Sequence, residues 1–159
     1  MTTIGIISDT HGLLRPEALE ALAGSQFIVH AGDIGDMAVI EGLRRIAPVT
    51  AVRGNVDSGD LQRAFSGSAV LEAAGKLIYV LHALDDLDLD LQASGFHVVV
   101  SGHSHQPKIE TRDEVLFLNP GSAGPRRFKL PVTVARMTIT GSSLEPRIIE
   151  LPVAGTRVG

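Results

Sequence analysis

The chain has 159 residues, which favours one compact domain spanning 1–159, and 44% of the residues are hydrophobic, which argues against disorder. The absence of cysteine excludes disulfides, thiolate nucleophiles and cysteine-ligated metal sites, and the net charge of −4 gives no basic surface for general nucleic-acid binding. The amino terminus lacks the basic segment of a signal peptide, and no apolar run reaches the about 20 residues that span a bilayer. We therefore expect a cytoplasmic protein with no membrane partner, and the sequence leaves a homo-oligomer open.

The first third of the chain predicts alternating strands and helices. Short apolar runs that end in polar residues indicate strands, and apolar residues at helical spacing, with Pro16 near a start and Gly24 at an end, indicate helices. The predicted elements are strands at 2–8, 26–33 and 49–58 and helices at 15–24 and 37–47. A strand–helix–strand–helix–strand order requires a parallel sheet.

The rest of the chain predicts further strands that form a second sheet. Residues 68–83 have the pattern of a hairpin that turns at Ala74–Gly75. Later strands are predicted at 96–105 and within 108–121 and 130–152, with turns at Arg112–Glu114 and Gly141–Ser143. The predicted fold class is therefore α/β, with two sheets packed together rather than one doubly wound sheet.

Residues 84–95 fit two patterns. Leucine and aspartate alternate at the period of a strand, but the leucines at 84, 87 and 91 also share one helical face. Aspartates near the start of this segment and Gly95 at its end favour a helix, which we predict.

Side chains that can bind metal ions follow the apolar runs. In open α/β sheets, ligands bind outside the carboxyl ends of the strands, so polar residues placed repeatedly at these ends converge on one spot. The candidates are Asp9, His11, Asp33, Asn55, His82, His103 and His105.

Each candidate also has an ordinary structural role open to it. The alternatives are a loop cap and a surface imidazole for Asp9 and His11, a helix N-cap for Asp33, a turn for Asn55 and a core position for His82. Only the segment 102–105 is suggestive alone, because alternate residues of an extended segment after a glycine can reach two different ions. The joint placement of all seven favours a metal site.

The donor types narrow the choice of metal. Four imidazoles, two carboxylates and one amide oxygen, without sulfur, suit Mn²⁺, Fe²⁺, Co²⁺, Ni²⁺ or Zn²⁺, and we expect Mn²⁺. Seven ligands are too many for one ion that keeps an open position, and they suit two ions that share a carboxylate. Two ions about 3.5–4 Å apart can clamp both the attacking and the leaving oxygen of a phosphoryl displacement.

These motifs resemble the calcineurin-like metallophosphoesterases, and in particular their small bacterial and archaeal single-domain phosphodiesterases. The matching segments are SDTHG at 8–12, HAGDI at 30–34, RGNVDS at 53–58, VLHA at 80–83, SGHSH at 101–105 and LNPGSAGPR at 118–126. The resemblance implies a four-layer α/β sandwich of two mixed β-sheets flanked by helices.

The resemblance also implies a role for each candidate. The first ion would be held by Asp9, His11 and His105, the second by Asn55, His82 and His103, and Asp33 would bridge both. A hydroxide between the ions would attack phosphorus in line. The ligands of the second ion would also orient the phosphate or support that hydroxide. Apart from the resemblance, Arg126 and Arg127 follow the NPGS turn and could contact the substrate phosphate, although a surface role fits them equally well.

Two positions depart from the family pattern. Val56 stands where many relatives carry a histidine that protonates the leaving oxygen, and valine has no proton to donate. The small branch often lacks this histidine, so water, another residue or a good leaving group would serve instead. Ala83 replaces the usual glycine beside the second ion. His30, inside a strand, is expected to be structural, and His97 to have no role.

The predicted function is a metal-dependent phosphodiesterase or phosphatase that acts on a small phosphoester. A non-catalytic protein-binding scaffold is one alternative, because the same fold serves as a scaffold subunit in eukaryotic membrane-trafficking complexes. A nuclease is another, and the acidic balance of the chain weighs against it.

Overall fold

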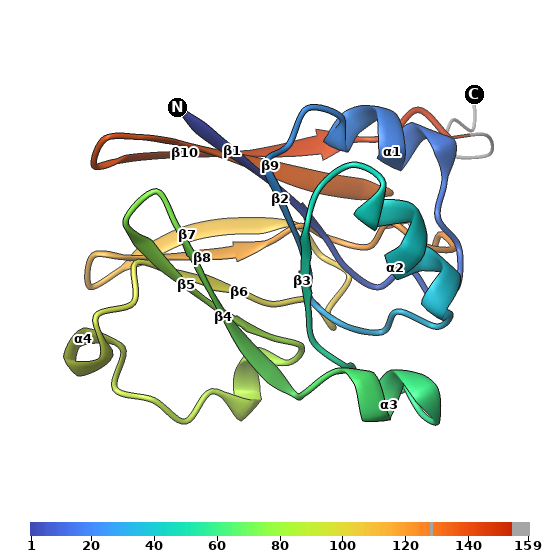
Figure 1. Cartoon of the computed structure of the whole chain (residues 1–159), viewed down its shortest axis with the longest axis horizontal. Helices are drawn as coiled ribbons and strands as arrows, with labels where there is room; N and C mark the ends of the chain where they lie inside the picture. Colours follow the sequence, from blue (N-terminus) through green and yellow to red (C-terminus); the bar gives the residue numbers. More distant parts are fainter. Residues whose placement is uncertain (128, 154–159) are drawn as a thin grey trace.

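Two five-stranded sheets form the centre of the molecule, and the computed structural model describes residues 1–127 and 129–153 (Figure 1). The first sheet has the order β10 (Ser143–Glu150), β9 (Thr133–Thr140), β1 (Thr2–Ile7), β2 (Phe27–His30) and β3 (Val49–Ala51). The second has the order β4 (Ser68–Ala73), β5 (Lys76–Leu81), β6 (Val98–Val100), β8 (Val115–Asn119) and β7 (Lys108–Arg112). Parallel pairs join β1, β2 and β3 and also β5, β6 and β8, and the other pairs are antiparallel.

Short helices cover the outer faces of both sheets. The helices of the described residues are α1 (Pro16–Leu22), α2 (Met37–Arg44), α3 (Asp60–Ala64), the 3₁₀ helix η1 (Leu84–Asp86) and α4 (Leu91–Ser94). The first sheet packs against α1 and α2, and the second carries η1 and α4 on its outer face (Figure 1). The predicted four-layer α/β sandwich is therefore confirmed. No helix in the described ranges combines the length and the apolar character needed to cross a bilayer.

Strand alternation divides the apolar side chains between separate cores. Ile4 and Ile6 of β1 pack between the sheets with residues such as Val80, whereas Ile7 joins the core beneath α1 and α2. Successive side chains of a strand point to opposite faces, so one strand serves both cores. Strands buried on both faces read as continuous apolar runs, which is why β6 consists of three valines.

The predicted strands are present but shorter than expected. Their polar ends lie in loops beyond the sheet, so that β2 stops at His30 and β6 stops at Val100. The turn of the β4–β5 hairpin is confirmed at Ala74–Gly75, where both residues have positive φ, of 51° and 77°. Positive φ at both central residues is the geometry that matches the twist of two paired strands.

The predicted helix over 84–95 is wrong in its middle. Only η1 and α4 are helical there, and the backbone at Leu87 and Asp90 is extended. The three leucines do pack against one apolar cluster. Their spacing therefore indicates that they are buried on one side, and it does not indicate a continuous helix. Four aspartates lie between residues 85 and 90, and short carboxylates favour helix ends over helix interiors. Asp90 accordingly caps the start of α4 by accepting from the amide of Ala93 at 3.2 Å. The short helix α3 was not predicted from the sequence.

Gly35, in the loop between β2 and α2, packs closely against the backbone of the loop after β1. Its φ is +88°, and a Cβ there would overlap the backbone of His11 and Gly12. We expect Gly35→Ala to lower the free energy of unfolding by about 3 kcal/mol or more, measured by urea denaturation. Gly141→Ala is the matched control, because its φ is +58° but nothing lies within 4 Å of the added Cβ. A loss of about 1 kcal/mol is expected there, and equal losses in both variants would contradict the close contact.

Candidate metal centre

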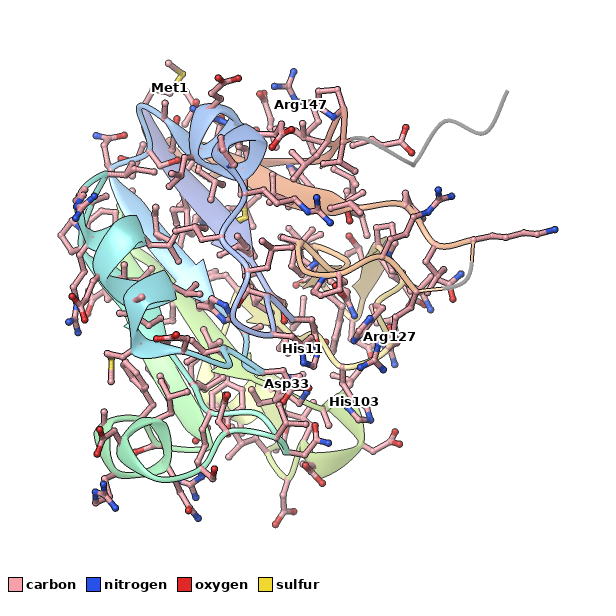
Figure 2. All side chains as sticks on the ribbon, turned by 90° about the vertical axis from the view of Figure 1, so that its right-hand side faces the viewer. Met1, His11, Asp33, His103, Arg127 and Arg147 are labelled. Carbon is pink, nitrogen blue, oxygen red and sulfur yellow. The ribbon has the colours of Figure 1, made fainter. Side chains whose placement is uncertain are left out.

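The loops that follow the parallel strands meet at one edge of the molecule. The amide of Asp9 donates to the carbonyl of Gly32 and the amide of His11 to the carbonyl of Asp33, both at 2.9 Å. These bonds tie the loop after β1 to the loop after β2. Figure 2 shows the side chains of His11, Asp33 and His103 gathered at this edge. The convergence expected from the strand ends is thus present in the structure.

Six of the seven candidate ligands form two groups. Within each group, one donor atom per residue lies within 4.8 Å of the others. The first group is Asp9, His11 and His105, and the second group is Asp33, His82 and His103. Asn55 is exposed and lines, with His82 and His103, a cavity of about 700 Å³ beside the second group.

The two carboxylates each divide their oxygens between the protein and the centre. Asp9 Oδ2 accepts from Ser8 Oγ at 2.6 Å and from the amide of His103 at 3.1 Å, while Oδ1 lies 3.3 Å from His105 Nε2. Asp33 Oδ1 accepts from the amide of Val56 at 3.1 Å, while Oδ2 faces the imidazoles. One oxygen of each carboxylate is therefore fixed, and the other is directed into the cluster of histidines.

Asp33 Oδ2 lies between the two groups. It is 3.8 Å from His11 Nε2 of the first group and 3.2 Å from His82 Nε2 of the second group. Asp9 Oδ1 is likewise 3.9 Å from both of these nitrogens. The two groups therefore form one continuous centre rather than two separate sites.

His82 is oriented by the ring nitrogen that faces away from the centre. Its Nδ1 lies 2.8 Å from the carbonyl oxygen of Ala31, which can only accept, so Nδ1 carries a proton. Nε2 is then directed at Asp33 Oδ2 and at His103 Nδ1, which is 3.3 Å away. Metal-binding histidines are commonly held in this way, with one nitrogen donating to a backbone carbonyl.

The residues of the second group shift one another's pKa values. Burial alone would raise the pKa of Asp33, but hydrogen bonds from His82 and from the amide of Val56 lower it below its usual value. Burial alone would lower the pKa of His82, but its bonds to Asp33 and to Ala31 raise it above its usual value. Asp33 is therefore ionised at neutral pH, as a metal-binding carboxylate must be.

Buried polar atoms without a hydrogen-bond partner collect in the first group. Five such side-chain atoms occur among the described residues, and three of them are Asp9 Oδ1, His11 Nε2 and His105 Nδ1. Each unpartnered buried polar atom costs about 1–3 kcal/mol. A cation bound between Asp9 Oδ1 and His11 Nε2 would satisfy both atoms, so the residues present fit a divalent metal ion.

The backbone is left-handed at five of the seven candidate ligands. Asp9, His11, Asp33, His103 and His105 have φ between 47° and 71°, and only three other non-glycine residues of the described chain have positive φ. Such conformations cost on the order of 1 kcal/mol each and cluster at functional sites. The three others lie in the hairpin turns, where positive φ is expected.

Asp57 supports the loops of the centre, a role that was not predicted from the sequence. Its buried carboxylate accepts from the amides of Ile34 at 3.0 Å, Gly35 at 2.9 Å and Gly54 at 2.9 Å. It therefore joins the loop that presents Asp33 to the loop that presents Asn55. In the sequence, the only indication of a role for Asp57 is its place within the RGNVDS segment. The backbone amides that its carboxylate binds are known only from the folded loops.

His30 is structural, as expected from its place inside β2. Its Nδ1 accepts from the amide of Gly32 at 3.1 Å, so its Nε2 carries the proton and donates to Thr10 Oγ1 at 3.0 Å. Thr10 Oγ1 in turn donates to the carbonyl of Ile34 at 2.9 Å. Burial lowers the pKa of His30 to about 3, so the ring stays neutral and links the first two loops.

The two arginines after the NPGS segment differ in their contacts. Arg126 Nε donates to the carbonyl of Leu130 at 3.2 Å, so part of its guanidinium is bound to its own loop. Arg127 is exposed and lies on the same side of the molecule as His11 and Asp33 in Figure 2. Burial lowers the pKa of His105, and the positive charge of Arg127 lowers it further.

The helix cap that was open to Asp33 is provided by another residue. Asp36 caps α2 by accepting from the amide of Ala38 at 2.9 Å. Asp33 is therefore left to face the imidazoles.

His97 lies at the strand edge, where its Nδ1 accepts from the amide of Leu77 at 3.0 Å.

Comparison with known proteins identifies the family. The model of the calcineurin-like phosphoesterase superfamily domain matches residues 2–142. The chain belongs to this superfamily. A probable metallophosphoesterase of Methanocaldococcus jannaschii is 33% identical over 93% of this chain and 81% of its own. A phosphodiesterase of the same organism is 26% identical over 74% of this chain and 82% of its own.

Solved structures with the same fold are also known. Vps29 of Entamoeba histolytica, determined with Zn²⁺, superposes with a TM-score of 0.73 at 18% identity, over 94% of this chain and 99% of Vps29. At this identity the likeness establishes the fold alone. The family and the two ligand groups together support a metal-dependent phosphoesterase that binds divalent metal ions.

The role of Asp57 can be tested by Asp57→Asn. The amide group cannot accept from all three backbone donors, so we expect a loss of about 2 kcal/mol in unfolding free energy. Because Ile34 and Gly35 directly follow Asp33, the affinity for Mn²⁺ in equilibrium dialysis should also fall by about 10–100-fold. Asp36→Asn is the control, because asparagine caps a helix as well as aspartate does. Unchanged stability and metal affinity in Asp57→Asn would contradict this role.

Proposed function

We propose that residues 1–159 act as one metallophosphoesterase domain that hydrolyses small phosphodiesters with two divalent metal ions. The observation that carries the proposal is the continuous centre in which oxygens of Asp9 and Asp33 each face histidines of both groups. A named phosphodiesterase among the relatives supports the preference for diesters.

In this proposal the ligands follow the family pattern. The first ion is held by Asp9, His11 and His105, the second by Asn55, His82 and His103, and Asp33 lies between them. The position of Asp33 Oδ2, 3.8 Å from His11 Nε2 and 3.2 Å from His82 Nε2, supports the shared role. Imidazole and carboxylate donors without sulfur support Mn²⁺, with Fe²⁺, Co²⁺, Ni²⁺ or Zn²⁺ as substitutes. When bound, the ions would neutralise charge on the phosphoryl oxygens and make water a stronger nucleophile.

The chain itself contributes positioning. Asn55 lines the cavity with His82 and His103, and its amide would orient a phosphoryl oxygen there. The same role is proposed for the exposed ring of His103. Arg126, which follows the NPGS segment, is proposed to contact the substrate phosphate.

Residue 56 is a valine, so its side chain cannot donate a proton to the leaving group. Val56 is half exposed, at 51%, and it contributes only its backbone amide, which donates to Asp33 Oδ1. General acid catalysis typically contributes about 10²–10⁴-fold, so without it the enzyme favours substrates whose leaving group needs no proton. Aryl phosphodiesters meet this condition.

A protein-binding scaffold is the rival function, and metal binding alone does not separate the two. Vps29 has the same fold and was determined with Zn²⁺, so a bound ion is compatible with either function. Turnover is therefore the discriminating measurement. A nuclease is the weaker rival, because the net charge of −4 disfavours a long polyanion.

The test is hydrolysis of bis(p-nitrophenyl) phosphate by purified protein loaded with Mn²⁺. We expect turnover that EDTA abolishes, and a fall on the order of 10³-fold in Asp33→Asn, which loses charge but not shape. Asp36→Asn, three residues away and exposed, should keep the wild-type rate. Absence of turnover with Mn²⁺, Ni²⁺, Co²⁺ and Zn²⁺ would favour the scaffold, and full activity in Asp33→Asn would contradict the shared ligand.

A further inference from the structure

A second cavity, of about 540 Å³, adjoins the metal centre. It shares His103, Ala83 and Asp85 with the cavity that holds Asn55 and His82. It lies on the outer face of the second sheet, where η1 and the loop of His103 approach the β7–β8 hairpin. A group attached to a phosphate at the metal centre would therefore have direct access to it.

The lining combines an apolar floor with a balanced set of charges. Phe117 of β8 contributes the floor, whereas the side chain of Leu118, which also borders the cavity, points into the core between the sheets. Lys108, Glu110 and Arg112 alternate along β7, so strand geometry places them on one face, where Glu110 is paired in register with Phe117. This row forms one wall of the cavity.

The charges of this wall bind one another. Glu110 Oε2 lies 3.2 Å from Lys108 Nζ and 3.4 Å from Arg112 Nε. Asp85 also lines the cavity, so two acidic side chains balance two basic ones. The cavity therefore offers no excess positive charge for a second phosphate, and it suits an uncharged group with hydrogen-bonding atoms.

Arg112 gives the cavity a surface for flat rings. Its guanidinium lies 4.3 Å from the centroid of the Phe117 ring, and its side chain is 50% exposed. A guanidinium that rests on one ring and remains accessible can stack on a second ring. Ligand pockets commonly have volumes of about 300–1,000 Å³, so a cavity of about 540 Å³ accommodates a group as large as a nucleoside.

We propose that this cavity binds one ester group of the phosphodiester, and that this group carries a flat unsaturated ring. Arg112 and Phe117 are then specificity-determining residues rather than catalytic ones. The inference rests on the proposed function, because it assumes that the phosphate of the substrate lies at the metal centre. Nucleobases and aryl groups share the flat-ring chemistry, and the test separates them.

The test compares three substrates that share the p-nitrophenyl leaving group and carry thymidine (5′-linked), phenyl or methyl as the second ester. For Mn²⁺-loaded wild type, we expect kcat/KM to be about tenfold higher for a ring ester than for the methyl ester, the size of one stacking contact. A preference for thymidine alone identifies a nucleobase as the ring, and an equal preference for phenyl identifies any aryl group.

The variants are Arg112→Ala and Phe117→Leu, which leave every proposed metal ligand in place. Each should lower kcat/KM for the ring esters by about tenfold and for the methyl ester by less than about twofold. An equal fall for all three substrates would also support the cavity, occupied then by the p-nitrophenyl group. Thr111→Ala is the control, because Thr111 lies between two lining residues of β7 but does not line the cavity. Falls below about twofold for every substrate in both variants would overturn the inference.

Binding measured by calorimetry keeps this test separate from catalysis. Thymidine 5′-monophosphate should bind the Mn²⁺-loaded wild type at least about fivefold more tightly than methyl phosphate, and Arg112→Ala should remove the difference. If none of the three esters is hydrolysed, the proposed function fails, and the binding comparison still decides the role of the cavity. Equal dissociation constants for the two phosphates in the wild type would overturn the inference. Melting temperature and bound metal, measured for each variant, confirm that the fold is intact.

Discussion

The structure depends on holding two carboxylates out of water beside one another. Asp9 is fully buried and Asp33 is 4% exposed. Burying an ionised carboxylate costs several kcal/mol unless charges and hydrogen bonds compensate it. One oxygen of each carboxylate accepts hydrogen bonds from the protein, and the other faces histidines. Among these facing atoms, Asp9 Oδ1 and His11 Nε2 have no hydrogen-bond partner. A bound cation removes this cost, so metal binding and the stability of the folded loops are linked.

The strained backbone of this centre lies in the loops and not in the strands. Left-handed backbone occurs at Asp9, His11 and Asp33, and again at His103 and His105. Hydrogen bonds between the loops compensate this strain. The buried carboxylate of Asp57 supplies two of them, from Ile34 and Gly35, and it accepts a third within its own loop, from Gly54. The donor atoms are consequently held in place before any ion arrives, which favours metal binding and catalysis alike.

The sequence was sufficient to predict the sheets and to bring the ligands together, because apolar runs mark buried strands and parallel strands end at a common edge. It did not predict what Asp57 binds, because its three partners belong to two loops that meet only in the folded chain. The helix expected at 84–95 failed because leucine spacing reports burial on one face, which two short helical pieces satisfy as well. The contact of Arg112 with Phe117 depends on the register of β7 and β8, which the sequence pattern leaves undetermined.

The central claim is that one continuous centre holds two ions with Asp33 between them. The most direct test is an anomalous difference map at the manganese absorption edge, from crystals of the protein grown with Mn²⁺. We predict two peaks about 3.5–4 Å apart, one at the first group and one at the second group, with an oxygen of Asp33 next to both. A single peak, or peaks that do not contact Asp33, would contradict the account.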